Sequence, residues 1–125
     1  MDETNLRAKI QEHLELIKYS PRAMKEASER ATAFLIMVAI LSDEKRNAIE
    51  DKAKLTTLRD ASYAQAFGRS QAKQVTEKKA EAENDVTYTE MRETLEQCEA
   101  KISWLKDHIE IFTNAHVTYR QLSKE

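Results

Sequence analysis

The residues that could perform covalent or metal chemistry are few and far apart. Cys98 is the only cysteine, which leaves no cysteine pair for a zinc site. Cys98 and His116 would lie about 27 Å apart along one helix, too far for a nucleophile and its base. The single glycine excludes a glycine-rich phosphate loop, and no glutamate precedes a histidine by three residues as in di-iron bundles. The sequence therefore predicts a protein that is not an enzyme and uses no cofactor or metal.

Side chains that could bind a polyanion are concentrated in one segment, although the net charge of −2 excludes a uniformly basic protein. Residues 52–79 hold seven cations against two acids, whereas residues 80–110 hold nine acids against three cations. Lysine and arginine follow phosphates and aromatic rings stack on bases, so this pattern predicts a single-stranded nucleic-acid site. The candidate residues are Lys52, Lys54, Arg59, Tyr63, Phe67, Arg69, Lys73, Lys78 and Lys79. The alternative is a solvated basic end that meets the acidic third helix of a neighbouring subunit.

The composition indicates that long helices carry these residues. One glycine and one proline leave few turns, while 34% charged and 41% apolar residues, rich in Ala, Glu, Lys and Leu, are typical of coiled coils. Asn5 is a plausible N-cap, Ser20-Pro21 a helix start, Gly68 a C-cap and Thr76 a further N-cap. The expected all-α fold is one domain over 1–125, with helices over 1–19, 20–67 and 76–122 and a hairpin loop over 68–75.

The third helix shows the clearest period in the sequence. Apolar positions alternate spacings of three and four, which predicts a left-handed coiled-coil seam packed antiparallel to the second helix. Its ten seam positions are Tyr88, Met91, Leu95, Cys98, Ile102, Leu105, Ile109, Phe112, His116 and Tyr119. Cys98 is expected to be a small core residue. His116 is expected to set the helix register, with pH sensing as the alternative, and His13 and His108 to lie on the surface.

The second helix carries an apolar belt that one partner helix cannot cover. Its centre, the run from Phe34 to Val38, is apolar around the whole helix. Either the first helix folds back on the belt or other subunits cover it. The predicted oligomer interface consists of Phe34, Leu35, Met37, Val38 and Leu41.

Location follows from what the sequence does not contain. Asp2 and Glu3 do not begin a secretory signal, and the longest apolar run, Ala33–Leu41, is far short of the roughly 20 residues that cross a bilayer. We expect a cytoplasmic protein, or one in the host cytoplasm if it is viral, with no membrane partner.

The layout resembles the T4-type family of phage recombination mediators. The likeness covers most of residues 21–120 and lies in chain length, the long hairpin, its basic tip and the Tyr63, Phe67 and Gly68 element that closes the second helix. The family's basic, glycine-containing C-terminal element has no clear counterpart in residues 114–120. The resemblance implies a ring-like homo-oligomer that binds single-stranded DNA and contacts a RecA-like recombinase. The alternative function is a structural coiled-coil adaptor, chaperone or virion component without a nucleic-acid role.

Overall fold

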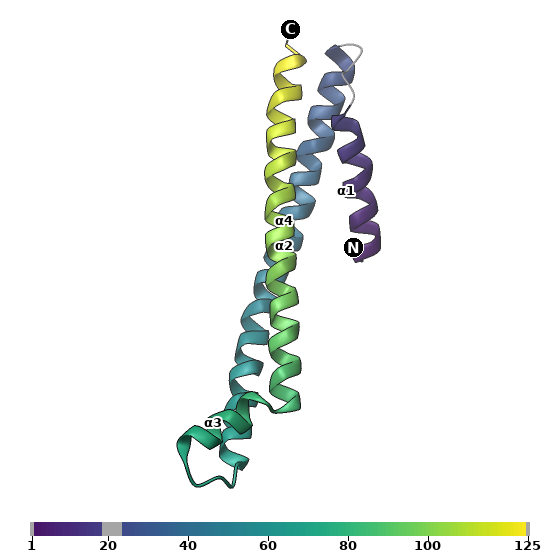
Figure 1. Cartoon of the computed structure of the whole chain (residues 1–125). Coiled ribbons are helices and arrows are strands. Elements are labelled where there is room, and N and C mark those ends of the chain that lie inside the picture. Colours follow the sequence, from purple (N-terminus) through teal and green to yellow (C-terminus); the bar gives the residue numbers. More distant parts are fainter. Residues whose placement is uncertain (1, 19–23, 125) are drawn as a thin grey trace. The chain divides into compact units, whose positions relative to one another are not determined.

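The computed structural model describes residues 2–18 and 24–124. Within these ranges the chain forms helices and no strand, which confirms the predicted all-α fold. Figure 1 shows the helices in chain order. They are α1 (Glu3–Ile17), α2 (Met24–Arg69), α3 (Val75–Glu83) and α4 (Val86–Leu122).

The N-cap of the first helix lies earlier than the predicted Asn5. The Asp2 carboxylate accepts a hydrogen bond of 2.8 Å from the backbone N–H of Asn5, so Asp2 is the N-cap and Asn5 lies inside α1. Both residues are good caps, and the one closer to the N-terminus satisfies the free N–H groups of the first turn. The predicted start of the second helix, Ser20-Pro21, lies outside the described residues.

The predicted hairpin loop is also shorter than expected. Gly68 was expected to end α2, but the helix continues to Arg69 and Gly68 has no positive φ. A glycine ends a helix when it adopts the left-handed conformation, and here it does not. Residues 70–74 form the connection, and α3 begins at Val75, so the Thr76 N-cap expectation is wrong by two residues because Gln74 is the N-cap.

The third predicted helix is two helices. It breaks at Asn84 and Asp85, where the Asn84 side chain donates to the carbonyl of Ala80 at 2.8 Å. The Asp85 carboxylate accepts from the backbone N–H of Tyr88 at 3.0 Å, as an N-cap does. A C-terminal cap followed directly by an N-terminal cap lets the chain change direction within two residues.

The described chain divides into two compact units, and α2 and α4 contribute to both. Unit 1 comprises the described residues of 1–45 and 104–125, and unit 2 comprises residues 46–103. In each unit the α2 and α4 segments run antiparallel (Figure 1). All ten predicted seam positions of α4 are buried or half-buried, as expected.

Unit 1 has a core of large side chains. The Phe34 ring stacks on Phe112 at a centroid distance of 6.0 Å and meets Tyr119 edge-on at 5.2 Å. Met37 and Leu41, one and two turns further along α2, are fully buried. Each such side chain contributes about 1.5–3 kcal/mol when it leaves water, so this cluster dominates the stability of the unit.

The first helix covers this core. Leu6 and Ile10 of α1 are buried, the Arg7 guanidinium lies 4.6 Å from the Trp104 ring centroid, and His13 meets Phe112 edge-on at 6.3 Å. Of the two ways to cover the apolar belt, the structure therefore supplies the first, in which α1 folds back within the chain.

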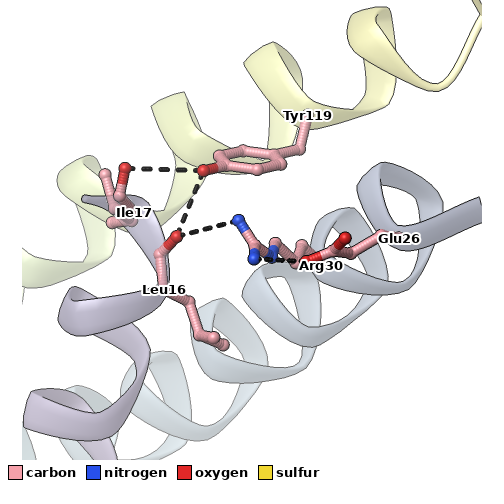
Figure 2. A network of polar contacts seen from close by, with 5 residues as sticks. All are labelled: Leu16, Ile17, Glu26, Arg30 and Tyr119. Carbon is pink, nitrogen blue, oxygen red and sulfur yellow. Dashed lines mark hydrogen bonds and ion pairs between the residues drawn. The ribbon is translucent and has the colours of Figure 1, made fainter. Parts of the chain in front are cut away.

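The end of α1 is held by groups from both long helices (Figure 2). The Tyr119 hydroxyl donates to the carbonyls of Leu16 at 3.2 Å and Ile17 at 3.4 Å. Arg30 donates to the Leu16 carbonyl at 3.3 Å and pairs with Glu26 at 2.5 Å. The last carbonyls of a helix have no partner inside it, so these bonds serve as a tertiary C-cap.

Unit 2 has a core of small side chains. Its buried apolar residues are Ala48 and Ala66 of α2, Ala82 of α3 and Leu95 of α4. Alanines let helix backbones approach closely, but they remove little apolar surface from water.

Candidate nucleic-acid interface

The nine predicted nucleic-acid residues all lie in unit 2, on three successive elements. Six lie on α2, Lys73 lies in the 70–74 connection, and Lys78 and Lys79 lie in the first turns of α3. Figure 1 shows α3 folded against the end of α2. The structure divides these residues into cations with a carboxylate partner, cations without one, and packed rings.

Two of the predicted cations have a carboxylate beside them. The Lys52 ammonium lies 3.9 Å from Glu99, and the Arg59 guanidinium lies 3.1 Å from Asp60. Both pairs are partly exposed and contribute less than about 1 kcal/mol each. A phosphate could compete for these cations, but it would first have to displace the carboxylate.

Other cations cluster without a carboxylate partner among the described residues. Arg69, Lys73 and Lys79 are exposed and lie within eleven consecutive residues, and the Arg69 side chain donates only to the backbone carbonyl of Gln65, at 3.4 Å. Lys54 is also exposed and without a carboxylate partner, but it lies four turns earlier on α2. We call Arg69, Lys73, Lys78 and Lys79 the basic end.

The predicted rings are packed inside the unit. Tyr63 stacks on Phe67 at 6.4 Å and meets Tyr88 of α4 edge-on at 5.4 Å, and all three are half-buried. The Lys78 ammonium lies over Phe67 at 5.7 Å and the Arg92 guanidinium over Tyr88 at 5.9 Å. Both rings therefore take part in contacts between helices, and their stacking on bases stays a prediction.

Local contacts fix the connection that carries Lys73. The Ser70 hydroxyl makes a short hydrogen bond to the Glu81 carboxylate and accepts from the backbone N–H of Ala72 at 3.2 Å. Ala82 is completely buried, which brings α3 close against its neighbours. Lys73 therefore lies in a connection that hydrogen bonds hold in place, and Lys79 lies on a helix that packs against its neighbours.

Tyr88, Arg92 and Glu81 belong to this site but were not predicted as part of it. Tyr88 was assigned only to the seam, and the other two were counted only as charges. The α4 period indicates that Tyr88 faces α2, where Tyr63 is the aromatic residue at that level. No sequence signal indicates the Ser70–Glu81 hydrogen bond, which depends on the break at Asn84.

The predicted oligomer interface lies in unit 1, and the structure uses most of it as core. Phe34, Met37 and Leu41 are 0% exposed within the single chain, so their assignment to an interface is corrected. Val38 is half-buried, and only Leu35 of the predicted five is exposed, at 51%. The neighbouring Ile36 is 54% exposed and was not included in the prediction.

The three histidines all lie in unit 1, and His13 and His116 contact another helix. His116 Nδ1 lies 2.8 Å from the Ala31 carbonyl of α2, so it can donate across the seam, as expected of a residue that sets register. His13 and His108 were expected on the surface, but His13 packs against Phe112 and His108 against Trp104 at 4.8 Å, and both are half-buried. Aromatic partners on α4 account for both positions.

Cys98 is a packed residue of unit 2. Its thiol donates to the Ala48 carbonyl at 3.2 Å. Burial raises the pKa of the Cys98 thiol, and the nearby Asp51 carboxylate raises this pKa further. Because the thiolate is the reactive form, Cys98 is poorly suited to nucleophilic chemistry at neutral pH.

An open groove of about 480 Å³ lies in unit 1 at the end of α1. Its lining includes Ile17 and Lys18 of α1 and Ile111, Ala115 and Leu122 of α4. In the described part of the chain, no three His, Cys, Asp or Glu side chains gather where they could hold a metal ion. None of the described helices is long and apolar enough to cross a membrane.

Comparison with known proteins adds no further identification. No family model, no curated protein and no solved structure matches this chain. The functional argument therefore rests on the geometry of the two units.

Proposed function

We propose that this protein is a non-enzymatic single-stranded nucleic-acid-binding accessory protein and that it binds through the basic end of unit 2. The observation that carries the proposal is the group formed by Arg69, Lys73 and Lys79, which are exposed and have no carboxylate partner in the described chain. Cations that already have a partner gain little from a phosphate, whereas uncommitted cations gain the full contact and release counterions from the nucleic acid.

The arrangement favours a flexible strand over a duplex. The four cations follow the end of α2, a connection and the start of α3, so the backbone that presents them changes direction twice. A single strand can bend its phosphates around such a surface, whereas duplex DNA is stiff, with a persistence length of about 150 base pairs. We therefore expect single strands to bind more tightly than duplex of the same charge.

The recombination-mediator resemblance gives a sharper form of the proposal. In that form the chain self-associates, binds single-stranded DNA at the basic ends of several copies, and contacts a RecA-like recombinase. Several basic ends on one strand would multiply the phosphate contacts and so steepen the dependence of affinity on salt. A co-sedimentation assay with single-stranded DNA and a RecA-like recombinase separates this form from simple strand binding.

A salt-dependent binding assay tests the proposal. Fluorescence anisotropy with a labelled single-stranded oligonucleotide should show binding near 50 mM salt that weakens toward 200 mM. Replacing Arg69 and Lys73 by glutamine should weaken binding and flatten the slope of log affinity against log salt by about 1.4, at about 0.7 per lost phosphate contact. Helix content should not change, because neither side chain supports the core.

A matched control uses the same change of charge in unit 1. Arg120 and Lys25 are exposed, and their joint replacement by glutamine removes one arginine and one lysine away from unit 2. This variant should bind like the wild type. Absence of binding by the wild type at 50 mM salt would overturn the proposal, as would equal losses in the two double variants.

One observation favours a second function. Leu35 and Ile36 are adjacent on α2 and more than half exposed, and exposed aliphatic pairs occur at protein contacts. This supports a helical adaptor, chaperone or virion component. If strand binding is absent and Leu35→Ser with Ile36→Ser lowers the measured mass of an oligomer, this second function replaces the first.

A further inference from the structure

The aromatic cluster of unit 2 bears on what the basic end can recognise. This step rests on the proposed function, because it concerns the chemistry of the strand that binds there. Tyr63 and Phe67 are the aromatic rings nearest the basic end on α2, and base stacking would require one of their faces to be free.

Neither ring is available in the structure without loss of packing. Phe67 has Tyr63 stacked on it at 6.4 Å and the Lys78 ammonium over it at 5.7 Å. Tyr63 in turn meets Tyr88 at 5.4 Å, and Tyr88 has Arg92 over it at 5.9 Å. A base that stacked on Phe67 would have to displace Lys78 or separate the two rings.

The cluster also joins the helices of this part of unit 2, because Tyr63 of α2 meets Tyr88 of α4 and Phe67 of α2 lies under Lys78 of α3. The buried residues around it are Ala66 and Ala82, which supply little apolar area, and Leu95 lies two turns further along α4. Withdrawing Tyr63 to meet a base would break its contact with α4, and withdrawing Phe67 would break its contact with Lys78 of α3. Lys78 sits on the ring while its neighbours Lys73 and Lys79 are exposed, so the surface offered to a ligand is cationic and not aromatic.

We infer that the basic end recognises the phosphate chain alone, so that a base-free polyanion is as good a ligand as single-stranded DNA of equal charge. The rings position Lys78 and the α3 helix and do not touch the bases. The chemical class of ligand is thus a flexible polyphosphate or phosphodiester chain. The two sources of this chemistry, inorganic polyphosphate and a nucleic-acid backbone, are distinguished by competition.

The test displaces a labelled oligothymidylate from the full-length protein near 50 mM salt. The competitors are unlabelled oligothymidylate, an abasic oligonucleotide of the same length, and inorganic polyphosphate matched in charge. All three should compete within about threefold of one another, because each contact is a counterion-releasing phosphate contact. An abasic strand that competes at least tenfold more weakly would overturn the inference while leaving strand binding intact. A polyphosphate that fails where the abasic strand succeeds would also overturn it, because recognition would then include the sugar.

Two variants separate the contribution of the aromatic rings to binding from that of the cations. Phe67→Leu keeps an apolar side chain in the cluster but removes the ring under Lys78, so any loss of affinity should be the same for oligothymidylate and for polyphosphate. Lys73→Gln with Lys79→Gln should flatten the salt slope by about 1.4 for oligothymidylate and for polyphosphate alike. A loss in Phe67→Leu that affects oligothymidylate but not polyphosphate, at unchanged helix content, would show that the ring contacts bases. If neither oligothymidylate nor polyphosphate binds the wild type, the proposed function fails and this inference fails with it.

Discussion

The two units use the same two long helices but hold them together differently. All six of the largest completely buried side chains belong to unit 1, and they include Phe34 and Phe112. Unit 2 is closed by three alanines, Leu95 and a half-buried ring cluster. Unit 1 also has a third long contact surface in α1, whereas unit 2 has only the nine residues of α3.

This difference assigns most of the stability to unit 1, whereas the basic end belongs to unit 2. Apolar area removed from water is the main stabilising contribution to a fold, and unit 1 buries most of the large apolar side chains. The clustered cations Arg69, Lys73 and Lys79 lie in unit 2, within eleven consecutive residues. Local stability in proteins is uneven, and binding segments usually lie at the less stable end.

The largest expected effect comes from placing a charge in the core of unit 1. Leu105 is 0% exposed, so Leu105→Asp would bury a carboxylate that has no partner. This burial costs several kcal/mol, which is more than about a third of the free energy of unfolding of a typical domain. Circular dichroism should report a large loss of helix. Val117→Asp, at a residue that is 48% exposed on the same helix, is the control and should remain folded. A fully helical Leu105→Asp protein would contradict the assignment of the core to unit 1.

A smaller effect is expected when a buried leucine of unit 2 is shortened to alanine. Leu95 is 3% exposed, and Leu95→Ala should lower the free energy of unfolding by about 2 kcal/mol, at the low end for buried leucines. The reason is that half-exposed neighbours can close over the lost volume. Urea unfolding measures the change. Leu58→Ala, at a leucine of the same unit that is 52% exposed, should cost less than about 0.5 kcal/mol. If Leu95→Ala costs as much as 5 kcal/mol, unit 2 is packed as firmly as unit 1.

The smallest effect is expected at the end of α1. Tyr119→Phe removes the hydroxyl that donates to the carbonyls of Leu16 and Ile17 but keeps the buried ring. The expected loss is about 1 kcal/mol in the free energy of unfolding, the usual net contribution of one hydrogen bond. Binding of an oligonucleotide should not change, because this residue lies in unit 1. Weaker oligonucleotide binding by Tyr119→Phe would show that the end of α1 takes part in the interface.

The sequence predicted the helices well because periodicity depends on local pattern. The ten seam positions of α4 were correctly predicted to face inward, since burial repeats along the helix. Gly68 was expected to end α2, and the break at Asn84 was not predicted. Neighbouring residues decide which of several possible caps is used.

The sequence predicted the charge of the candidate site but not the contacts that its residues make. Composition alone placed Arg69, Lys73 and Lys79 in one basic segment, and the structure leaves them exposed. Composition could not show that Phe67 lies under Lys78 or that Lys52 is paired with Glu99, because both contacts join different helices. The apolar belt was ambiguous for the same reason, since Phe34 needed a cover and only the fold shows that α1 provides it.

Hydrogen exchange measured with and without a single-stranded oligonucleotide tests the central claim, which is that unit 1 holds the fold and the basic end of unit 2 binds. Without ligand, amides around Phe34 and Leu41 should exchange more slowly than those of α3. With saturating oligonucleotide near 50 mM salt, exchange should slow over residues 69–79 and stay unchanged over residues 104–122. Slowed exchange confined to unit 1, or a basic end whose exchange does not change while the oligonucleotide is bound, would contradict the account.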